Sequence, residues 1–245
     1  MKRYLSLLLA LVMVLGSFSF AFAANDVDPA KFLADQGILV GDKKTGDLML
    51  YHPLKRQDAV VMLSRLMDEE SIAENFEVTS RFPSFTDIKD PYYKPFIAWA
   101  EANEYVKGHS GKRAGEFGYN DYLTARQYAV ILLRALGYVE EADDWYKAFD
   151  TAEYLGLLEN IRADKDEEIL RKEMAQMTYN ALDTELKNSD KTLAEKLGID
   201  MPVDKPEELE LVDVKADNLK EVEVIFNQKI DEATVTDSNI KIKDG

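Results

Sequence analysis

The fold of this chain is decided by a five-residue stretch that occurs three times, as Leu54-Lys-Arg-Gln-Asp58, Leu123-Thr-Ala-Arg-Gln127 and Ile169-Leu-Arg-Lys-Glu173. Each stretch follows a polar loop and opens a run in which apolar residues recur every three to four positions. That spacing predicts an amphipathic helix after each stretch. A further helix is expected before each loop, over residues 29–36, 92–103 and 145–154. The chain is therefore expected to repeat a helix-loop-helix unit three times.

The segments around these stretches share further motifs. The second copy carries Phe85-Thr-Asp87, Gly108, a polar loop over residues 111–117 and Leu132-Leu-Arg-Ala-Leu-Gly137. The first copy has Gly37-Ile-Leu-Val-Gly41 and Met62-Leu-Ser-Arg-Leu66, with Asp26-Val-Asp28 in the place of Phe-x-Asp. The third copy has Asn160 where the second glycine is expected. Together these motifs resemble the S-layer homology (SLH) repeat, in which Ile-Thr-Arg-Ala-Glu opens the second helix.

The resemblance implies a mainly α fold, with three SLH repeats in a pseudo-threefold bundle followed by a short immunoglobulin-like β segment. It divides the chain into a signal peptide 1–23, repeat one 24–67, an acidic linker 68–81, repeat two 82–140, repeat three 141–187, a linker 188–206 and the start of a β domain 207–245.

The N-terminus has the composition of an export signal. Lys2 and Arg3 precede an apolar run of about 18 residues, and Ala21-Phe-Ala23 offers a small-residue cleavage site. The alternative is an uncleaved membrane span, for which this run is near the lower limit of length. The cleavage site favours a signal peptide and a secreted protein with no membrane segment after cleavage.

The composition excludes several classes of function. The chain has no cysteine, so disulfides and thiolate metal sites are ruled out. Its net charge is −16, and about −18 without Lys2 and Arg3. Such an acidic chain lacks the clustered cations that bind nucleic acid phosphates or anionic membranes.

The C-terminal region changes from helical to alternating periodicity. Residues 209–216 and 221–226 alternate apolar and polar side chains around Asp217-Asn218, which predicts a β-hairpin, and residues 240–243 predict a further strand. The segment 222–242 resembles the opening of bacterial immunoglobulin-like domains. Such a sandwich needs roughly 100 residues. We therefore expect the front end of a longer protein, the alternative being a short β appendage.

Candidates for catalysis are few, and we expect no enzyme activity and no cofactor. The two histidines, His52 and His109, lie in different loops. The segment Asp164-x-Asp166-x-Glu168 begins like a calcium loop but has Ile169 where the sharp turn needs glycine. Incidental calcium binding stays open, and no pair of carboxylates is singled out for hydrolysis.

The arginines of the repeated stretch are the first candidates for binding. Arg56 and Arg171 match the arginine of the family pattern, at a helix start whose N–H groups and dipole favour an anion. Arg126 stands one residue later, about 100° around the helix, because Ala125 occupies the matching position. The alternative is that each arginine closes the helix start by pairing with Asp58 or Glu173.

Further candidates come from the loops. Gly41 and Gly108 match the loop glycine of the family, which lets a ligand approach the backbone. Asp87 is expected either to cap the helix 92–103 or to contact the ligand. Aromatic side chains that could face sugar rings or enter the core are Tyr51, Phe117, Tyr119, Trp99 and Trp145.

The resemblance implies carbohydrate binding. The expected function is non-catalytic, non-covalent anchoring of a surface protein to the bacterial cell wall, through an anionic secondary cell-wall polysaccharide that often carries a pyruvate ketal. Self-assembly into a surface lattice is the second expected partnership. The alternative is the wall-anchoring module of an extracellular enzyme, such as a polysaccharide hydrolase, whose catalytic domain follows residue 245. A third reading is a small carboxylate-based enzyme.

Overall fold

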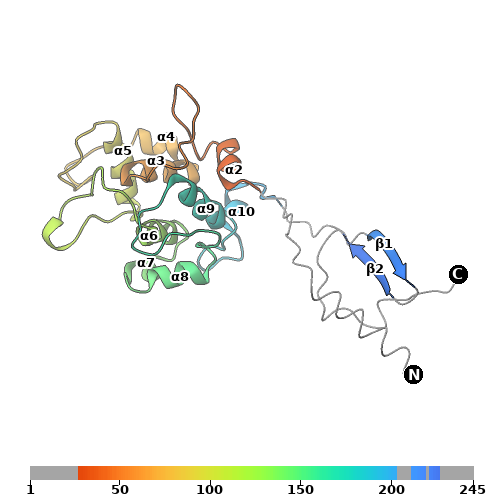
Figure 1. The fold of residues 1–245 in the computed structure, drawn as a ribbon. Coiled ribbons are helices and arrows are strands. Elements are labelled where there is room, and N and C mark those ends of the chain that lie inside the picture. Colours follow the sequence, from red (N-terminus) through yellow and green to blue (C-terminus); the bar gives the residue numbers. More distant parts are fainter. Residues whose placement is uncertain (1–26, 203–210, 219–220, 227–245) are drawn as a thin grey trace. The chain divides into compact units, whose positions relative to one another are not determined.

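The computed structural model describes residues 27–202, 211–218 and 221–226 (Figure 1). A compact helical unit spans Val27–Met201, and a β segment follows it in the chain. The expected mainly helical fold is confirmed. The predicted signal peptide lies outside the described residues. Of the helices in the described ranges, none has the length and apolar character needed to cross a bilayer.

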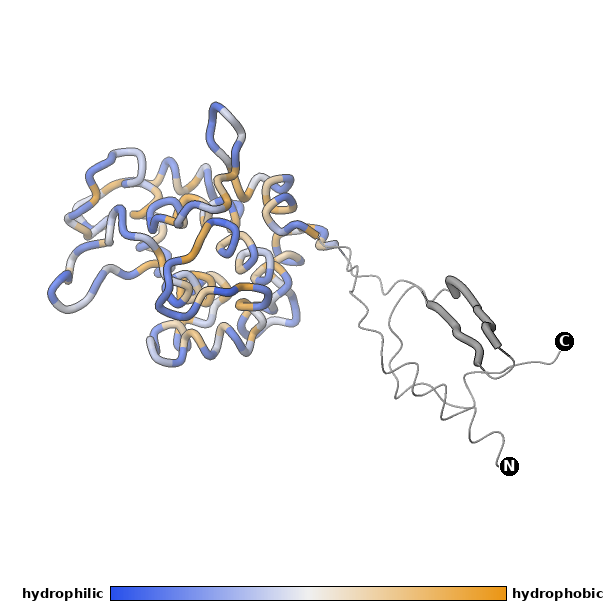
Figure 2. The backbone as a smooth tube through the Cα atoms, in the orientation of Figure 1, coloured by the Kyte–Doolittle hydropathy of each residue, from blue (hydrophilic) through white to orange (hydrophobic). Residues whose placement is uncertain are grey.

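Six helices correspond to the predicted pairs. Those preceding the loops are α2 Pro29–Asp35, α5 Tyr93–Ala102 and α8 Ala148–Tyr154; those opened by the repeated stretch are α3 Arg56–Leu66, α6 Ala125–Ala135 and α9 Arg171–Leu182. The prediction for the third pair began too early, because residues 145–147 precede α8. Figure 2 shows hydrophobic residues concentrated on the helices and hydrophilic ones on the outer loops.

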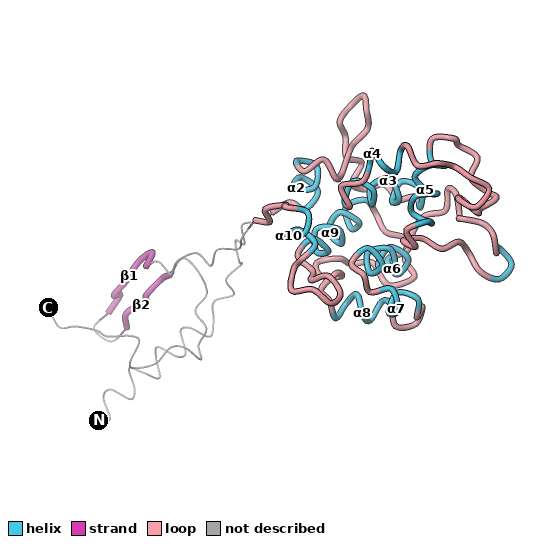
Figure 3. Tube along the Cα trace, turned by 180° about the vertical axis from the view of Figure 1, so that it is seen from behind, coloured by secondary structure: helices cyan, strands magenta, loops and turns pink. Residues whose placement is uncertain are grey.

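Each helix that precedes a loop packs against a helix from a different repeat. Helix α5 of repeat two contacts α3 of repeat one, and α8 of repeat three contacts α6 of repeat two. Helix α2 of the first segment contacts α9 of the third, so the three contacts form a closed cycle. The two helices lie side by side in both Figure 1 and Figure 3. The apolar stripe of each of these helices is thus covered by a helix from another of the three segments, so the segments share one core of buried residues.

A ring of three backbone hydrogen bonds joins the repeats at the residue that opens each stretch. The Leu54 N–H donates to the Ile169 carbonyl at 3.0 Å, Leu123 to Leu54 at 2.9 Å and Ile169 to Leu123 at 2.9 Å. All three side chains are buried. The ring brings the starts of α3, α6 and α9 together, although they are far apart in the sequence.

Both predicted linkers contain packed helices. Helix α4, Glu70–Glu74, lies in the predicted acidic linker, contacts α5 and buries Ala73. The Glu69 carboxylate, just before it, accepts a hydrogen bond of 2.8 Å from Nε1 of the buried Trp99. Helix α10, Leu193–Leu197, lies in the predicted second linker and packs on α9. A helical turn was among the expectations for the first segment, whereas the helix in the second was not expected; both segments bury a few apolar side chains. One further short helix, α7, spans Val139–Asp143, and a 3₁₀ turn covers Gly111–Arg113.

The start of α6 carries a capping box. The Gln127 N–H donates to Oγ1 of Thr124 at 3.3 Å, and the Thr124 N–H donates to the Gln127 side chain at 3.2 Å. Thr124→Ala removes one acceptor of the pair, so we expect the free energy of unfolding to fall by about 1 kcal/mol. Urea denaturation of the variant against Tyr122→Phe, an exposed neighbour, measures this, and an unchanged midpoint would contradict it.

The β segment forms the predicted hairpin. Strand β1, Leu211–Asn218, pairs antiparallel with β2, Glu221–Phe226, and Val214 faces Val224. Asp217 and Asn218, expected as the turn, belong to β1. The further strand predicted at residues 240–243 and the immunoglobulin-like comparison fall mostly outside the described residues.

Candidate functional site

Arg56, at the first turn of α3, is buried against the loop of repeat two. Its Nε donates to the Phe117 carbonyl at 2.9 Å, and one terminal nitrogen donates to the Lys107 carbonyl at 3.3 Å. The guanidinium lies 5.0 Å from the centre of the Phe117 ring. Burial lowers the pKa of Arg56 to about 10, so the group stays charged at neutral pH. Arg56 therefore ties two repeats together and is only 8% exposed.

Arg171, at the first turn of α9, makes the matching contacts with repeat one but remains half-buried. Its Nε donates to the Leu48 carbonyl at 2.8 Å, and Nη2 donates to the Val40 carbonyl at 3.0 Å. Partial burial lowers its pKa. Within the described part of the chain, Nη1 makes no hydrogen bond, and the side chain lines a groove.

Arg126, at the second position of α6, faces repeat three in a different way. One terminal nitrogen donates to the Trp145 carbonyl at 3.4 Å and the other to the Asp166 carboxylate at 3.2 Å. The Trp145 ring centre lies 5.0 Å from the guanidinium. The side chain is buried, and its Nε has no hydrogen-bond partner.

The expected unpaired N–H groups at the helix starts are already satisfied by backbone. The N–H of Arg56 donates to the Asp121 carbonyl, that of Ala125 to Glu167, and that of Arg171 to His52. The alternative, in which the arginines pair with Asp58 or Glu173, is wrong. Asp58 accepts a hydrogen bond from the Tyr93 hydroxyl at 2.8 Å, and Glu173 accepts one from the Leu170 N–H at 3.0 Å. These three N–H groups are therefore not available to a ligand.

A groove of about 210 Å³, which we call the Arg171 groove, lies where α9 meets the first loop, α3 and the start of α5. Its polar lining includes Lys43, Arg65 and Arg171 with the single carboxylate of Asp58. Its apolar lining includes Met49, Met62 and Met174. A local excess of cations is notable in a chain of net charge −16, because it gives an anion one favourable place to bind.

Two contacts fix the electrostatics of the Arg171 groove. Arg65 is paired through Nε with Glu70 at 2.7 Å, which leaves its charge partly compensated. The Tyr93 hydroxyl donates a hydrogen bond to Asp58. Burial raises the pKa of the Tyr93 phenol, and this hydrogen bond raises it further. Tyr93 therefore stays neutral and holds Asp58 on the side wall. Lys43 is exposed on the loop above.

The two loop glycines are required by their own loops. A Cβ on Gly41 would lie 2.5 Å from the Gly46 carbonyl oxygen, and one on Gly108 would lie 2.6 Å from both the Glu116 oxygen and the Phe85 ring. Glycine therefore lets each loop fold back on itself. Gly41 also lines the Arg171 groove.

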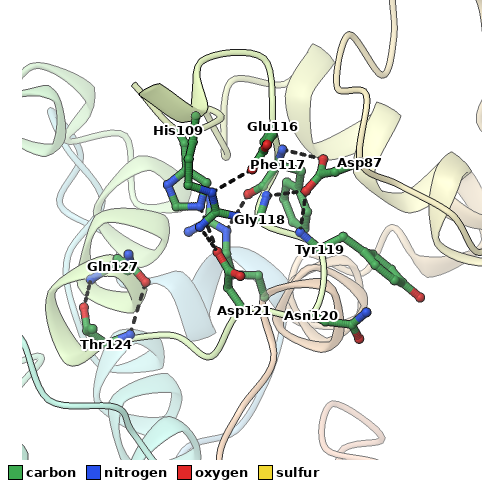
Figure 4. A network of polar contacts seen from close by, with 12 residues as sticks. Asp87, His109, Glu116, Phe117, Gly118, Tyr119, Asn120, Asp121, Thr124 and Gln127 are labelled. Carbon is green, nitrogen blue, oxygen red and sulfur yellow. Dashed lines mark hydrogen bonds and ion pairs between the residues drawn. The ribbon is translucent and has the colours of Figure 1, made fainter. Parts of the chain in front are cut away.

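The prediction that Asp87 caps the helix 92–103 is wrong. Its carboxylate accepts from the N–H groups of Phe117, Gly118 and Tyr119 at 2.7, 2.9 and 2.8 Å (Figure 4). The helix start is instead served by Asp90, which accepts from the Tyr92 N–H at 2.9 Å. Asp87 thus holds the loop that supplies the Arg56 contact.

The aromatic candidates separate by exposure. Phe117 and Trp99 are fully buried and belong to the core. Trp145 is 44% exposed and Tyr51 is 76% exposed, so the core interpretation of Trp145 is wrong. Tyr51 lies beneath the Lys172 ammonium, 5.6 Å from its ring centre. Only Trp145 combines an exposed ring with one of the three arginines.

Two of the histidine and carboxylate candidates, His109 and Asp166, make side-chain contacts within the protein. Nε2 of His109 lies 3.0 Å from the Asp121 carboxylate (Figure 4). Arg113 donates to the same carboxylate at 2.6 Å. Asp166 pairs with Arg126. Among the described residues, no three His, Asp or Glu side chains are grouped so as to hold a metal ion.

Sequence reasoning missed several residues of the Arg171 groove. Lys43, Arg65 and Tyr93 come from three separate elements, and no local pattern links them. The only available signal was the position of Arg65 in Met62-Leu-Ser-Arg-Leu66, which the family pattern also has.

No model of a known protein family matches this chain, and no curated protein is significantly similar to it. The geometry of the site must therefore support any functional conclusion by itself.

Proposed function

We propose that the helical unit is a trio of SLH repeats that anchors an exported surface protein to the cell wall without catalysis. The ligand is an anionic secondary cell-wall polysaccharide, and the β-hairpin opens an immunoglobulin-like region. The closed ring through Leu54, Leu123 and Ile169 supports a pseudo-threefold arrangement, because it relates the three stretches by the same backbone contact.

The single observation that carries the proposal is the lining of the Arg171 groove. Arg171 presents a planar guanidinium whose Nη1 makes no hydrogen bond to any described residue, and Lys43 lines the same groove. A guanidinium N–H forms a charge-assisted hydrogen bond with a carboxylate, and Nη1 of Arg171 offers such a donor. The methionine side chains nearby can pack against a small apolar group. A pyruvate ketal has both features, a carboxylate and a methyl group on one carbon.

The strength of one such contact limits the anchoring. A hydrogen bond between charged groups contributes about 1.5–3 kcal/mol. The chain as a whole repels an anionic polymer, but salt screens that repulsion beyond about 8 Å. Recognition must therefore be local to the groove, and firm attachment requires several such sites that are physically linked.

We expect residues 24–201, which include the whole helical unit, to sediment with purified wall sacculi. Chemical removal of the accessory polymer should leave the protein in the supernatant, because the proposed ligand is gone while the peptidoglycan mesh remains. Sedimentation before and after stripping, with heat-unfolded protein as the control for nonspecific adhesion, measures this. Equal binding to stripped walls would exclude the polymer as the ligand.

A further inference from the structure

The three arginines of the repeated stretch differ in how their Nε groups are satisfied. In Arg56 and Arg171, Nε donates to a loop carbonyl at 2.9 and 2.8 Å, and Nη2 donates to a second carbonyl. In Arg126 the Nε is buried and has no hydrogen-bond partner among the described residues, and the residue as a whole is only 7% exposed. Arg126 is thus the one member of the trio that lacks the common pattern of contacts.

The difference follows from the register of the stretch. Ala125 takes the first helical position of α6, where α3 and α9 have Arg56 and Arg171. A shift of one residue turns the side chain by about 100° around the helix axis. Arg126 therefore enters the next loop from another direction and meets a carboxylate, that of Asp166, instead of a second carbonyl.

Asp166 also borders an open hollow. The hollow measures about 650 Å³ and is lined by Phe149, Asp164, Lys165, Asp166 and Glu167. The Asp166 side chain is 66% exposed, whereas that of Arg126 is 8% exposed. On the other side, the Trp145 ring covers the guanidinium at 5.0 Å and remains 44% exposed. Asp166 is the only carboxylate in contact with Arg126 among the described residues.

We infer that Asp166 occupies, with its own carboxylate, the place that an anionic sugar would take at Arg126. The groove between repeats two and three is then closed to anions, and the Arg171 groove is the working site of the chain. Removing the Asp166 charge opens a second anion site between Arg126, Trp145 and the hollow. Asp164 and Glu167 also line the hollow, and the Lys165 charge offsets only one of these two carboxylates. The second site is therefore expected to bind an anion more weakly than the Arg171 groove does. The inference rests on the proposed function for its choice of ligand.

The test titrates the full chain calorimetrically with a methyl hexoside that carries a pyruvate ketal, and with the same glycoside lacking the ketal. The parent should bind one equivalent of the ketal and none of the control sugar. Asp166→Asn should bind two equivalents, the second more weakly. Asp164→Asn changes the net charge of the chain equally and makes no contact with Arg126, so it should still bind one.

Tryptophan fluorescence locates the added site. Trp99 is fully buried and Trp145 is exposed beside Arg126, so ligand should change the Trp145 emission in Asp166→Asn and leave it unchanged in the parent. Because the replaced side chain is largely exposed, the variant should melt at nearly the parent temperature.

The outcomes separate the two proposals. If Asp166→Asn binds no more equivalents than the parent, or if the parent binds two, the closed-groove inference is overturned. If the parent binds none and Asp166→Asn binds one, the inference stands and the proposed function of the Arg171 groove fails. If neither protein binds, both fail.

Discussion

Replacing Arg171 by alanine is expected to lower the affinity of the chain for the wall polymer about 10- to 150-fold. The change removes the guanidinium from the groove, and a charge-assisted hydrogen bond contributes about 1.5–3 kcal/mol, which converts to that range of dissociation constants. The fraction of protein that sediments, measured over a series of wall concentrations, gives the affinity. Calorimetry with polymer fragments provides a second measurement free of avidity.

Matched variants separate binding from stability. Arg162→Ala removes an exposed arginine outside the groove and changes the net charge equally, so it should bind like the parent. Arg171→Lys keeps the charge but loses the planar fork, and an intermediate affinity is expected. Arg171 also holds the Val40 and Leu48 carbonyls, so part of the loss could come from a displaced loop.

Lys43→Ala resolves that ambiguity, because Lys43 is exposed on the groove loop and its removal should leave the melting temperature unchanged. A several-fold loss of affinity is expected from the missing charge. If Arg171→Ala and Lys43→Ala both bind walls as tightly as the parent, the Arg171 groove is not the site.

The helices were predictable because their information is local. The apolar spacing after Leu54, Leu123 and Ile169 gave three helices that the structure has at residues 56–66, 125–135 and 171–182. The displacement of Arg126 relative to Arg56 was equally visible, since it needs only an alignment of the stretches. As a result of that displacement, Arg126 donates to the Asp166 carboxylate, whereas Arg56 donates to backbone carbonyls.

The partners of the helices could not be predicted in the same way. The periodic apolar residues of α2 indicate that one face of the helix is buried, but they do not indicate which element covers that face. The covering helix is α9, which begins 136 residues after the end of α2 at Asp35. The ring of backbone bonds that makes this closure possible has no signature in the side chains.

Local signals were also misjudged where composition suggested a linker. Thr192 and Glu195 have the spacing of a capping box, and the structure uses them so at the start of α10. That signal was present within a polar segment and pointed to a helix. For α4 the sequence offers no comparable cap, and only its packing on α5 explains the helix.

The role of Asp87 shows the limit for site residues. The sequence places it shortly before a helix, which favours capping, but its three N–H donors lie at residues 117–119, about 30 positions away. A loop that approaches from that distance leaves no mark near Asp87. The capping prediction for Asp87 is therefore wrong, and the predicted ligand contact of Asp87 stays a prediction.

Asp87→Ala is expected to lower the free energy of unfolding by about 2–4 kcal/mol. The substitution leaves three partly buried backbone N–H groups without an acceptor, and each costs about 1 kcal/mol or more. The loop they belong to carries Phe117, a fully buried ring whose carbonyl binds Arg56. Urea denaturation measures the change. Asp90→Ala removes a carboxylate that accepts only from Tyr92 among the described residues, and it should cost clearly less.

Acid titration tests the same contact independently of the substitution's effect on packing. Burial of the Asp87 carboxyl favours its neutral form, but the three N–H donors outweigh burial and lower its pKa below the ordinary 3.8. Because the pKa of Asp87 is lower in the folded state than in the unfolded state, its contribution to the free energy of unfolding is complete above the ordinary pKa of 3.8. That contribution is lost as the pH falls through the folded pKa. The stability difference between the parent and Asp87→Ala should therefore be constant at neutral pH and shrink below about pH 4. A difference that stays constant down to pH 2 would show that the charge on Asp87 does not hold the loop.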